Sequence, residues 1–328
     1  MADGRGRNPA VTAWLSLGSW IGSHLMVVVP AGVALGILFP QVLLPLKPFV
    51  PVLFAIMTFQ NSLGNDLRST RHALANPLVL VAVLAMVHVF MPLLTFAASS
   101  MLFGADSPTV AGVVLEYAVP VGASTVMWIS VFSGELALGL STLLASTLLA
   151  PFSIPLTLQL LVGTTVEVDA LGMMADMAFM IALPALAATL LNELTHGRAA
   201  ERLAPATTPL SRILLPIIVS TNATGISGYL HNLTPRLVGI MAFMLAFAVL
   251  SFVLGMGLAR LLSKGDDARF VAVSFSCGIR NVSAGAVLAS QYFGPEVMFP
   301  AVIGTLFQQF LAALFGNVVQ WVLKRSHR

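Results

Sequence analysis

Charged residues and cysteine are scarce in this sequence. Only 9% of the 328 residues are Asp, Glu, Lys or Arg, whereas a soluble domain contains about 25%. Hydrophobic residues make up 58% of the chain, and the mean hydropathy is +0.94. This composition excludes a soluble globular domain. Because backbone polar groups in a bilayer must be bonded within the protein, we expect an all-α, polytopic membrane protein.

Cysteine occurs once, at Cys277, which excludes an intramolecular disulfide framework and any multi-cysteine metal site. A small buried apolar residue is the simplest interpretation of Cys277. The sequence also lacks the paired aspartates, the serine with histidine and the zinc motif of intramembrane proteases, and the glycine-rich phosphate loop of an ATP-driven pump. These absences predict that the chain is not an enzyme.

Basic residues lie in short loops between apolar runs, where they set topology, so the sequence pI of about 9.4 does not indicate a nucleic-acid partner. With the N-terminus inside, only Lys47 and Arg236 fall outside, while almost all others, including Arg68, Arg71 and Arg328, fall inside. The positive-inside rule then places both termini in the cytoplasm of a bacterial-type inner (plasma) membrane. We expect a monomer there.

Apolar runs of about 20 residues, the length that crosses a bilayer, predict ten transmembrane helices. They cover residues 22–41, 47–64, 76–97, 108–132, 136–163, 170–194, 209–229, 236–261, 270–291 and 298–323. Residues 10–21, which carry Trp14 and Trp20, are expected to lie at the membrane interface. No cleavable signal peptide is expected, because the first apolar run is long and lacks a small-residue cleavage site.

Ten spans suggest two repeats of five, of which the second is inverted in the membrane. Residues 1–163 would form the first repeat and residues 170–324 the second. Landmarks recur at a nearly constant offset, such as Pro30 in span one and Pro184 in span six. Such internal symmetry is typical of secondary transporters.

Two spans are interrupted by small and polar residues, span four at Pro120-Val-Gly-Ala-Ser-Thr125 and span nine at Ser276-Cys-Gly-Ile-Arg-Asn281. Backbone that leaves a helix at membrane depth is tolerated only where it lines a cavity or is buried in protein. Interrupted spans at corresponding places in two halves mark a transporter's binding site, and the half-helix N-termini favour negative charge. The breaks therefore predict a secondary transporter of a small or amphipathic organic anion.

The substrate-binding candidates are the polar residues at or facing these breaks. They are Arg280, Asn281, Ser124, Thr125, Asn61, Asn222, Gln308 and Gln309. Hydrogen bonding from helix to helix is the alternative role for the amides.

The sequence resembles the bile acid:sodium symporter family, which includes bacterial members that carry other organic anions. The resemblance rests on Ala123-Ser-Thr-Val-Met127, Gly134-Glu-Leu-Ala-Leu138, Ser146-Thr-Leu-Leu-Ala-Pro151, Cys277-Gly-Ile-Arg-Asn281 and Gln308-Gln309. It implies alternating access by a panel domain of spans 1, 2, 6 and 7 and a core domain of spans 3–5 and 8–10. Broken spans four and nine would cross near the midplane.

The chain departs from the family pattern at the residues that hold sodium. Ser276 and Arg280 stand where sodium-coupled members have a glutamate and, four residues later, a glutamine, and Val87 replaces a glutamine of span three. Sodium is a hard cation that prefers oxygen ligands. The resemblance thus implies at most a degenerate sodium site, near Ser124, Thr125, Thr147, Ser276 and Arg280. No other metal and no cofactor is expected.

These departures favour a sodium-independent transporter. Two alternatives stay open, namely an ordinary sodium:organic anion symporter with a shifted ion site, and an uncoupled channel or substrate-sensing protein on the same fold.

Arg280 is the one arginine expected near mid-membrane, where a charge costs at least about 2.5–3.5 kcal/mol. It replaces sodium as a fixed internal cation, or it binds the substrate's carboxylate or sulfonate, or it forms a permanent ion pair with Glu116 or Asp176. All three interpretations stay open.

Proton coupling is also open. Glu116 lies one turn before the first break, where a buried carboxylate can exchange a proton, or it lies in water near the outer surface. His88 in span three titrates near neutral pH or is a hydrogen-bonded packing residue.

Overall fold

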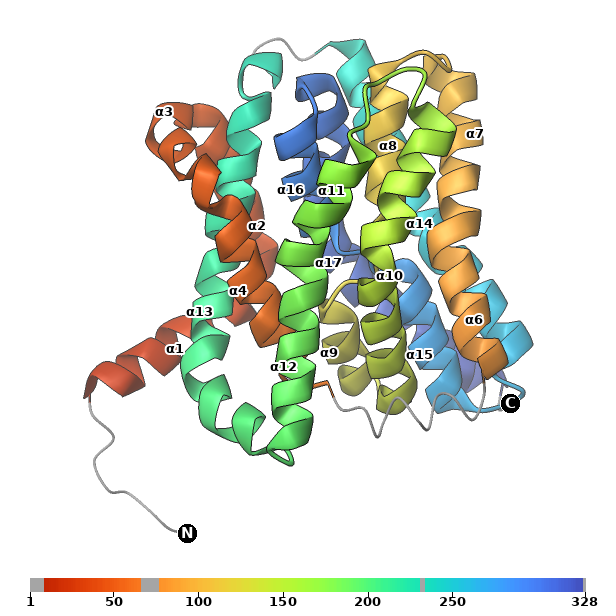
Figure 1. Ribbon diagram of the computed structural model, residues 1–328. Helices are drawn as coiled ribbons and strands as arrows, with labels where there is room; N and C mark the ends of the chain where they lie inside the picture. Colours follow the sequence, from red (N-terminus) through yellow and green to blue (C-terminus); the bar gives the residue numbers. More distant parts are fainter. Residues whose placement is uncertain (1–8, 66–76, 231–233, 327–328) are drawn as a thin grey trace.

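The computed structural model describes residues 9–65, 77–230 and 234–326 of the chain. The predicted loop residues Arg68 and Arg71, the first residue of predicted span three and the terminal Arg328 lie outside these ranges. Within them all regular structure is helical, as predicted (Figure 1). The longer helices are α1 (Pro9–Ser23), α2 (Leu25–Leu38), α4 (Val50–Ser62), α6 (Pro77–Ala85), α7 (Met91–Phe103), α8 (Pro108–Ala118), α9 (Ser124–Val131), α10 (Leu136–Val162), α11 (Ala170–Met177), α12 (Leu183–Leu194), α13 (Arg198–Ala223), α14 (Pro235–Leu262), α15 (Asp267–Gly278), α16 (Val282–Tyr292) and α17 (Pro295–Ser326). Shorter elements are α3 (Pro40–Leu43), η1 (Leu44–Phe49), η2 (Met86–Phe90), η3 (Ala178–Ala182), η4 (Thr224–Ile226) and η5 (Gly228–Leu230).

Seven described helical stretches are long and apolar enough to cross a membrane. They are Pro40–Ser62, Pro77–Phe103, Leu136–Val162, Ala170–Leu194, Arg198–Ile226, Pro235–Leu262 and Pro295–Arg325. Each covers most of one predicted span, and Pro40–Ser62 also includes residues 40 and 41 of predicted span one. The chain is therefore an integral, all-helical membrane protein. Predicted spans four and nine are each divided into two shorter helices, and the helix of predicted span one, α2, forms with α1 a pair bent by 87°.

Helix α1 leaves the axis of α2 at this bend and packs along α13. The Trp14 indole N–H donates to the carbonyl oxygen of Ala206 at 3.0 Å. A Cβ at Gly18 would collide with Pro209, so the glycine permits the close approach of the two helices. This course, nearly perpendicular to α2, fits the predicted interfacial segment.

Helix α13 begins at Arg198, earlier than the predicted start of span seven at residue 209. Helix α13 contains Pro205 and Pro209, and an interior proline removes one backbone hydrogen bond. The helix nevertheless continues through both, since neighbouring helices at membrane depth compensate such interruptions.

Two turns of π-helix interrupt spans three and six. The turn η2 precedes Pro92, and η3 precedes Pro184, each by one residue of the following helix. Proline has no N–H to offer the carbonyl four residues earlier, and a π-turn relieves that mismatch locally. Such turns are frequent at functional sites.

Helices α13 and α8 each pack against several neighbours. Helix α13 packs against α2 and α4, whereas α8 packs against α7, α10, α16 and α17. Figure 1 shows α1, α2, α4 and α13 on one side of the molecule and α6 to α8, α14 and α15 on the other. Helix α1 and the end of α17 lie toward the same end of the molecule.

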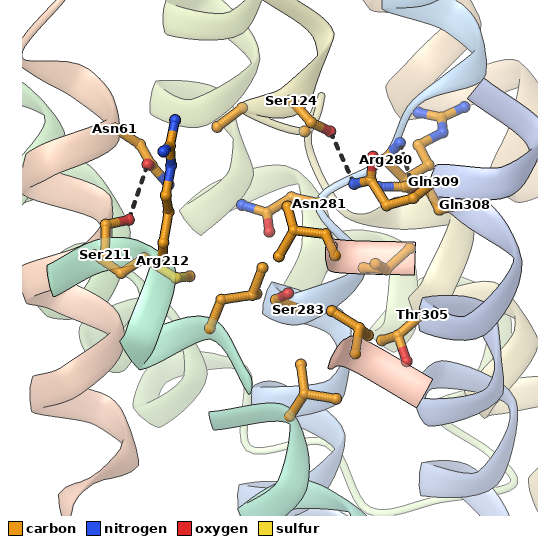
Figure 2. Close-up of a pocket in the computed structure, with 18 residues that line it drawn as sticks. Asn61, Ser124, Ser211, Arg212, Arg280, Asn281, Ser283, Thr305, Gln308 and Gln309 are labelled. Carbon is orange, nitrogen blue, oxygen red and sulfur yellow. Dashed lines mark hydrogen bonds between the residues drawn. The ribbon is translucent and has the colours of Figure 1, made fainter. Parts of the chain in front are cut away.

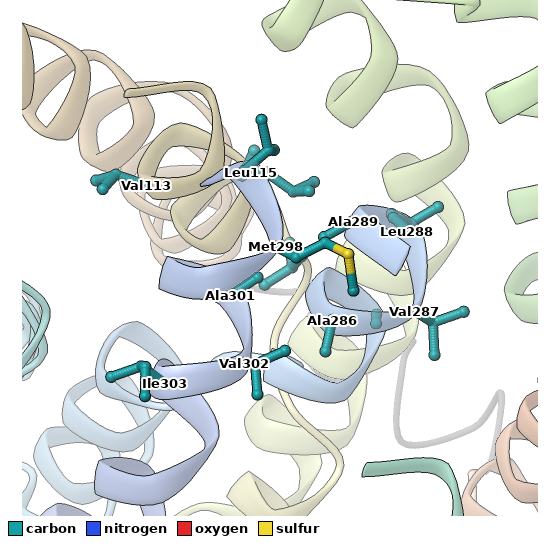
Figure 3. Close-up of a cluster of buried hydrophobic side chains, with 14 of the residues drawn as sticks. Val113, Leu115, Ala286, Val287, Leu288, Ala289, Met298, Ala301, Val302 and Ile303 are labelled. Carbon is teal, nitrogen blue, oxygen red and sulfur yellow. The ribbon is translucent and has the colours of Figure 1, made fainter. Parts of the chain in front are cut away.

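A buried apolar cluster joins α8, α16 and α17, and its members include Val113, Leu115, Val287 and Met298 (Figure 3). A Cβ at Gly112 would collide with the backbone of α17. Close packing through small residues is the usual way to associate helices in lipid. It holds the half-helices α8 and α16 rigidly against α17.

Candidate functional site

Both predicted breaks are confirmed, and they cross each other. Helix α8 ends at Ala118 and α9 starts at Ser124, while α15 ends at Gly278 and α16 starts at Val282. The Gly122 N–H donates to the carbonyl oxygen of Ile279 at 3.2 Å, and the Asn281 N–H donates to that of Pro120 at 2.8 Å. Backbone groups that leave their helices are thus paired with each other.

Side chains satisfy further backbone groups at the crossing. The Val121 N–H donates to Ser146 Oγ at 2.9 Å, and the Arg280 N–H donates to Gln308 Oε1 at 3.1 Å. Asn281 caps α16, since its Oδ1 accepts from the Ala284 N–H at 3.2 Å. The crossing is therefore a built element whose backbone polar groups are held in place.

A cavity of about 250 Å³ opens beside the crossing (Figure 2). Helices α2, α4 and α13 form one wall, and the two breaks with α9, α16 and α17 form the other. Its polar lining residues are Asn61, Ser124, Ser211, Arg212, Arg280, Asn281, Ser283, Thr305, Gln308 and Gln309. No carboxylate is among the described residues that line it.

Six of the eight predicted substrate residues line this cavity, and Thr125 and Asn222 do not. Thr125 is fully buried on α9. Asn222 is 1% exposed near the end of α13, and neither polar atom of its side chain has a partner among the described residues.

Four polar residues of the cavity were missed by the sequence analysis, namely Arg212, Ser211, Ser283 and Thr305. Arg212 was counted there as a cytoplasmic charge, but it lies well inside α13. A charged residue within an apolar stretch was the signal that could have identified it.

Hydrogen bonds to neighbouring side chains hold the amide groups of Gln309 and Asn61 in place. Gln309 donates from Nε2 to Ser124 Oγ at 3.4 Å and accepts at Oε1 from the Trp128 indole at 3.3 Å, which ties α17 to α9. The Ser211 hydroxyl donates to Asn61 Oδ1 at 3.3 Å. Gln60, by contrast, bonds to α13 through Thr207 and Thr208, which is the helix-to-helix role.

Arg280 contributes its backbone to the cavity, while its side chain points away into the helix core (Figure 2). Its Nη1 donates to the carbonyl oxygen of Val87 at 3.1 Å. Its Nε and Nη2 are buried without a partner among the described residues, and the whole residue is 3% exposed. In this conformation the guanidinium does not reach the cavity.

Glu116 is 3% exposed, which overturns the alternative that it lies in water at the outer surface. It shares a second cavity, of about 20 Å³, with Arg280. No ion pair joins the two among the described residues, and Glu116 Oε2 has no partner there. Gly285 and Gly304 leave room for the carboxyl, because a Cβ at Gly285 would lie 2.8 Å from Oε2 and one at Gly304 would collide with Oε1.

The alternative partner of Arg280, Asp176, is engaged elsewhere. Its Oδ2 accepts from the Tyr292 hydroxyl at 2.6 Å. Burial, together with this hydrogen bond, raises the pKa of Tyr292 above its ordinary value, so the phenol stays a donor at physiological pH.

His88 lies on the π-turn η2 and bonds through both ring nitrogens. Nε2 is 2.8 Å from Ser146 Oγ, and Nδ1 is 3.0 Å from Ser153 Oγ. The turn η2 thus contacts the second break directly through Val87 and Arg280, and it reaches the first break indirectly, because His88 bonds to Ser146 of α10 and Ser146 accepts from the Val121 N–H. This geometry fits the hydrogen-bonded packing role for His88, and the residue does not line the large cavity.

The hydroxyl groups of the degenerate sodium site do not share a common bonding partner in the part of the chain that the structure describes. Thr147 donates to the carbonyl oxygen of Leu143 in its own helix at 2.7 Å. The hydroxyls of Thr125 and Ser276 are buried without partners in the described ranges. No group of three or more His, Cys, Asp or Glu residues that could hold a metal occurs among the described residues.

Comparison with known proteins assigns a family. The profile of the Sodium Bile acid symporter family matches residues 50–233. The chain is 34% identical over 290 residues to the uncharacterized protein YbaS of Bacillus subtilis (strain 168), covering 88% of this chain and 94% of the relative. It is 28% identical over 263 residues to the probable sodium/metabolite cotransporter BASS1, chloroplastic, of Arabidopsis thaliana, covering 78% of this chain and 62% of the relative. It is 23% identical over 286 residues to the uncharacterized sodium-dependent transporter YocS of Bacillus subtilis (strain 168), covering 86% of each.

Proposed function

The chain belongs to the Sodium Bile acid symporter family, and on that premise we propose that it is a secondary transporter that moves a small organic anion by alternating access, without sodium. The observation that carries the proposal is the cavity beside the crossing. The N-terminal residues of α9 and α16 line it, Arg212 lines it, and no carboxylate does so among the described residues. Helix N-termini and arginine both favour an anion.

The size of the cavity supports a small substrate over a large amphipathic one. Its volume of about 250 Å³ lies below the roughly 300–1,000 Å³ typical of pockets for drug-sized ligands. Hydroxyl and amide groups predominate among its polar side chains, so the substrate is expected to be polar as well as charged.

The proposed architecture has ten spans in two inverted repeats, residues 1–163 and 170–324. Seven long helices account for spans 2, 3, 5, 6, 7, 8 and 10, and α2, the pair α8 and α9, and the pair α15 and α16 account for the others. Spans 1, 2, 6 and 7 form the panel and the rest the core. The position of the cavity, between α2, α4 and α13 and the crossing, supports movement of core against panel.

Sodium independence is supported by where the Arg280 guanidinium lies. Its Nη1 bonds to the carbonyl oxygen of Val87, the residue that stands where the family resemblance expects a glutamine of span three. The remaining residues do not fit sodium, since no carboxylate stands at Ser276 and the Thr147 hydroxyl is bonded within its helix. A hard cation prefers several free oxygen ligands.

Glu116 is proposed to balance the charge of Arg280. The cavity of about 20 Å³ that they share is enough for roughly one water. Such a water would join Glu116 Oε2 to the unpaired guanidinium nitrogens. An isolated buried charge is strongly unfavourable, and a paired one much less so.

A sodium-coupled symporter with a shifted ion site is the second candidate, because two relatives carry sodium in their names. Flux into proteoliposomes separates the candidates. A thermal-shift panel of short carboxylates and sulfonates first identifies an anion that binds, and this anion in labelled form is the probe.

Uptake of this probe is then measured against unlabelled internal probe, with sodium replaced by potassium and with or without a proton gradient. We expect counterflow that is unaffected by the replacement. Sodium dependence would favour the second candidate. Flux without counterflow would indicate a channel, and binding without flux a sensor.

A further inference from the structure

We propose that Arg212 is the specificity-determining residue that binds the anionic group of the substrate, a role that rests on the proposed function. The cavity has two arginines in its lining, Arg212 on α13 and Arg280 at the second break. The Arg280 guanidinium is sealed in the core. Arg212 is therefore the lining arginine that is partly exposed, with its guanidinium against Gly18 and Gly22 of α1.

The donors of Arg212 are largely unused. Its Nη1 donates to the carbonyl oxygen of Gly18 at 3.1 Å, and this is its one hydrogen bond within the described residues. A guanidinium has five N–H donors in a fixed planar fork. Most of them remain for a ligand. No described carboxylate in the lining competes for them.

Helix α1 holds the guanidinium in place. A Cβ at Gly22 would lie 2.8 Å from both Cζ and Nε of Arg212, so the absent side chain leaves the space that the guanidinium fills. Gly18, one turn earlier, supplies the carbonyl acceptor. A charged group fixed before the ligand arrives loses less freedom on binding than a mobile one.

The neighbours of Arg212 suit a carboxylate. Asn61 and Ser211 lie beside it at the same wall, opposite Gln308 and Gln309 (Figure 2). The Ser211 hydroxyl donates to Asn61 Oδ1, and within the described residues no hydrogen bond occupies the Asn61 amide N–H groups. Arginine recognises carboxylates through paired N–H donors, and an amide N–H adds a further one.

The substrate would thus span the cavity. Its carboxylate would lie at α13 and its uncharged polar part at the crossing, near Ser124 and Asn281. These two walls belong to the two helix groups that the proposed mechanism moves. An anion bound by Arg212 on one wall and by the half-helix N-termini on the other would contact both of the helix groups that move.

Binding to the full-length protein in nanodiscs tests this assignment. Acetate, propionate, lactate, malonate and succinate serve as probes, with propionamide as the neutral analogue. The dissociation constant of the best probe is measured for wild type, Arg212→Lys and Arg212→Gln. Arg202→Gln is the matched control, because Arg202 is exposed on the same helix and does not line the cavity.

We expect Arg212→Gln to weaken binding by at least about tenfold, the effect of losing one charged hydrogen bond. Arg212→Lys should retain part of the affinity, and Arg202→Gln should retain all of it. Affinity unchanged in a folded Arg212→Gln protein would overturn the assignment and leave the proposed function standing. If wild type binds none of the anions, or binds propionamide equally well, both are overturned.

Discussion

Glu116 shows at the residue scale how much the site depends on what is absent from neighbouring helices. Its carboxyl occupies space left by Gly285 on α16 and Gly304 on α17. Neither glycine has a positive φ. Their role is therefore steric, and they place a carboxylate close to Arg280 at the centre of the protein.

Gly304→Ala is expected to destabilise the protein, because the new methyl group would collide with Glu116 Oε1. Overpacking of this kind costs about 1–3 kcal/mol. A lower midpoint in thermal unfolding in detergent would show it. Gly257→Ala is the matched control, since a Cβ at Gly257 has nothing within 4 Å. Adding Glu116→Asp should restore part of the loss, because the shorter side chain withdraws the carboxyl. Equal midpoints for Gly304→Ala and Gly257→Ala would contradict the steric role.

Arg280 and Ser276 give the residue-scale test of coupling. If Arg280 replaces sodium, the double change Arg280→Gln with Ser276→Glu should install sodium-dependent transport, because it supplies the missing oxygen ligands. Probe uptake in sodium and in potassium is compared for the double variant, Arg280→Gln alone and wild type. Failure of the double variant to gain sodium stimulation, with its fold intact, would count against replacement.

The π-turn η2 is the informative feature at the scale of elements. It ends at the proline-containing first turn of α7 and brings Val87 and His88 to the two breaks. Through Ser146 it supports the Val121 N–H of the first break. The turn η2 thus supports both breaks, the second through Val87 and the first through Ser146.

Ser146→Ala should destabilise the crossing more than an ordinary loss of a buried hydroxyl. The Val121 N–H would be left buried without an acceptor, which costs about 1–3 kcal/mol. The midpoint of thermal unfolding and the rate of probe uptake are measured, and both should be lower than in wild type. Ser274→Ala is the control, because within the described residues its buried hydroxyl bonds to the Phe270 carbonyl of its own helix and to nothing else. Similar small effects for the two variants would show that Ser146 is not a support.

At this scale the sequence predicted the breaks well and the cavity lining incompletely. Small and polar residues at membrane depth locate Gly122 and Asn281 without a structure, because apolar helices have little other use for them. Arg212 was not identified as a cavity residue, because it lies near the predicted start of span seven and was counted as a cytoplasmic charge. The direction of the Arg280 side chain could not be predicted either, because it depends on the Val87 carbonyl freed by a distant π-turn.

At the scale of the whole molecule, the cavity and the contacts of Tyr229 and Tyr292 lie in different parts of the structure. The cavity lies among the second half of α13, the start of α2 and the end of α4, next to the junction of α1 and α2. Tyr229 packs edge-on against Phe299 with ring centroids 5.7 Å apart, and Tyr292 bonds to Asp176. Under the proposed topology these contacts shut the outer side in an inward-open state.

Tyr292→Phe should loosen this closure, because it removes the 2.6 Å hydrogen bond to Asp176. A Ser283→Cys reporter in the cavity makes the change visible, since the only native cysteine, Cys277, is buried. A membrane-impermeant maleimide should label the reporter faster from outside in the Tyr292→Phe background, by several-fold. Leu171→Ala is the control, because Leu171 is exposed on α11. An unchanged rate of labelling from outside would contradict the proposal that the hydrogen bond between Tyr292 and Asp176 closes the outer side.

The fixed charge of Arg280 has a consequence for the electrical work of a transport cycle. A sodium ion is released after each crossing, whereas an arginine is covalently attached and returns with its helix. Over a full cycle its contribution therefore cancels, and the net charge moved is that of the substrate alone. Each elementary charge is worth about 2.3 kcal/mol per 100 mV. With a negative interior, an uncoupled carrier of this kind would export its anion down the membrane potential and import it only against an opposing voltage.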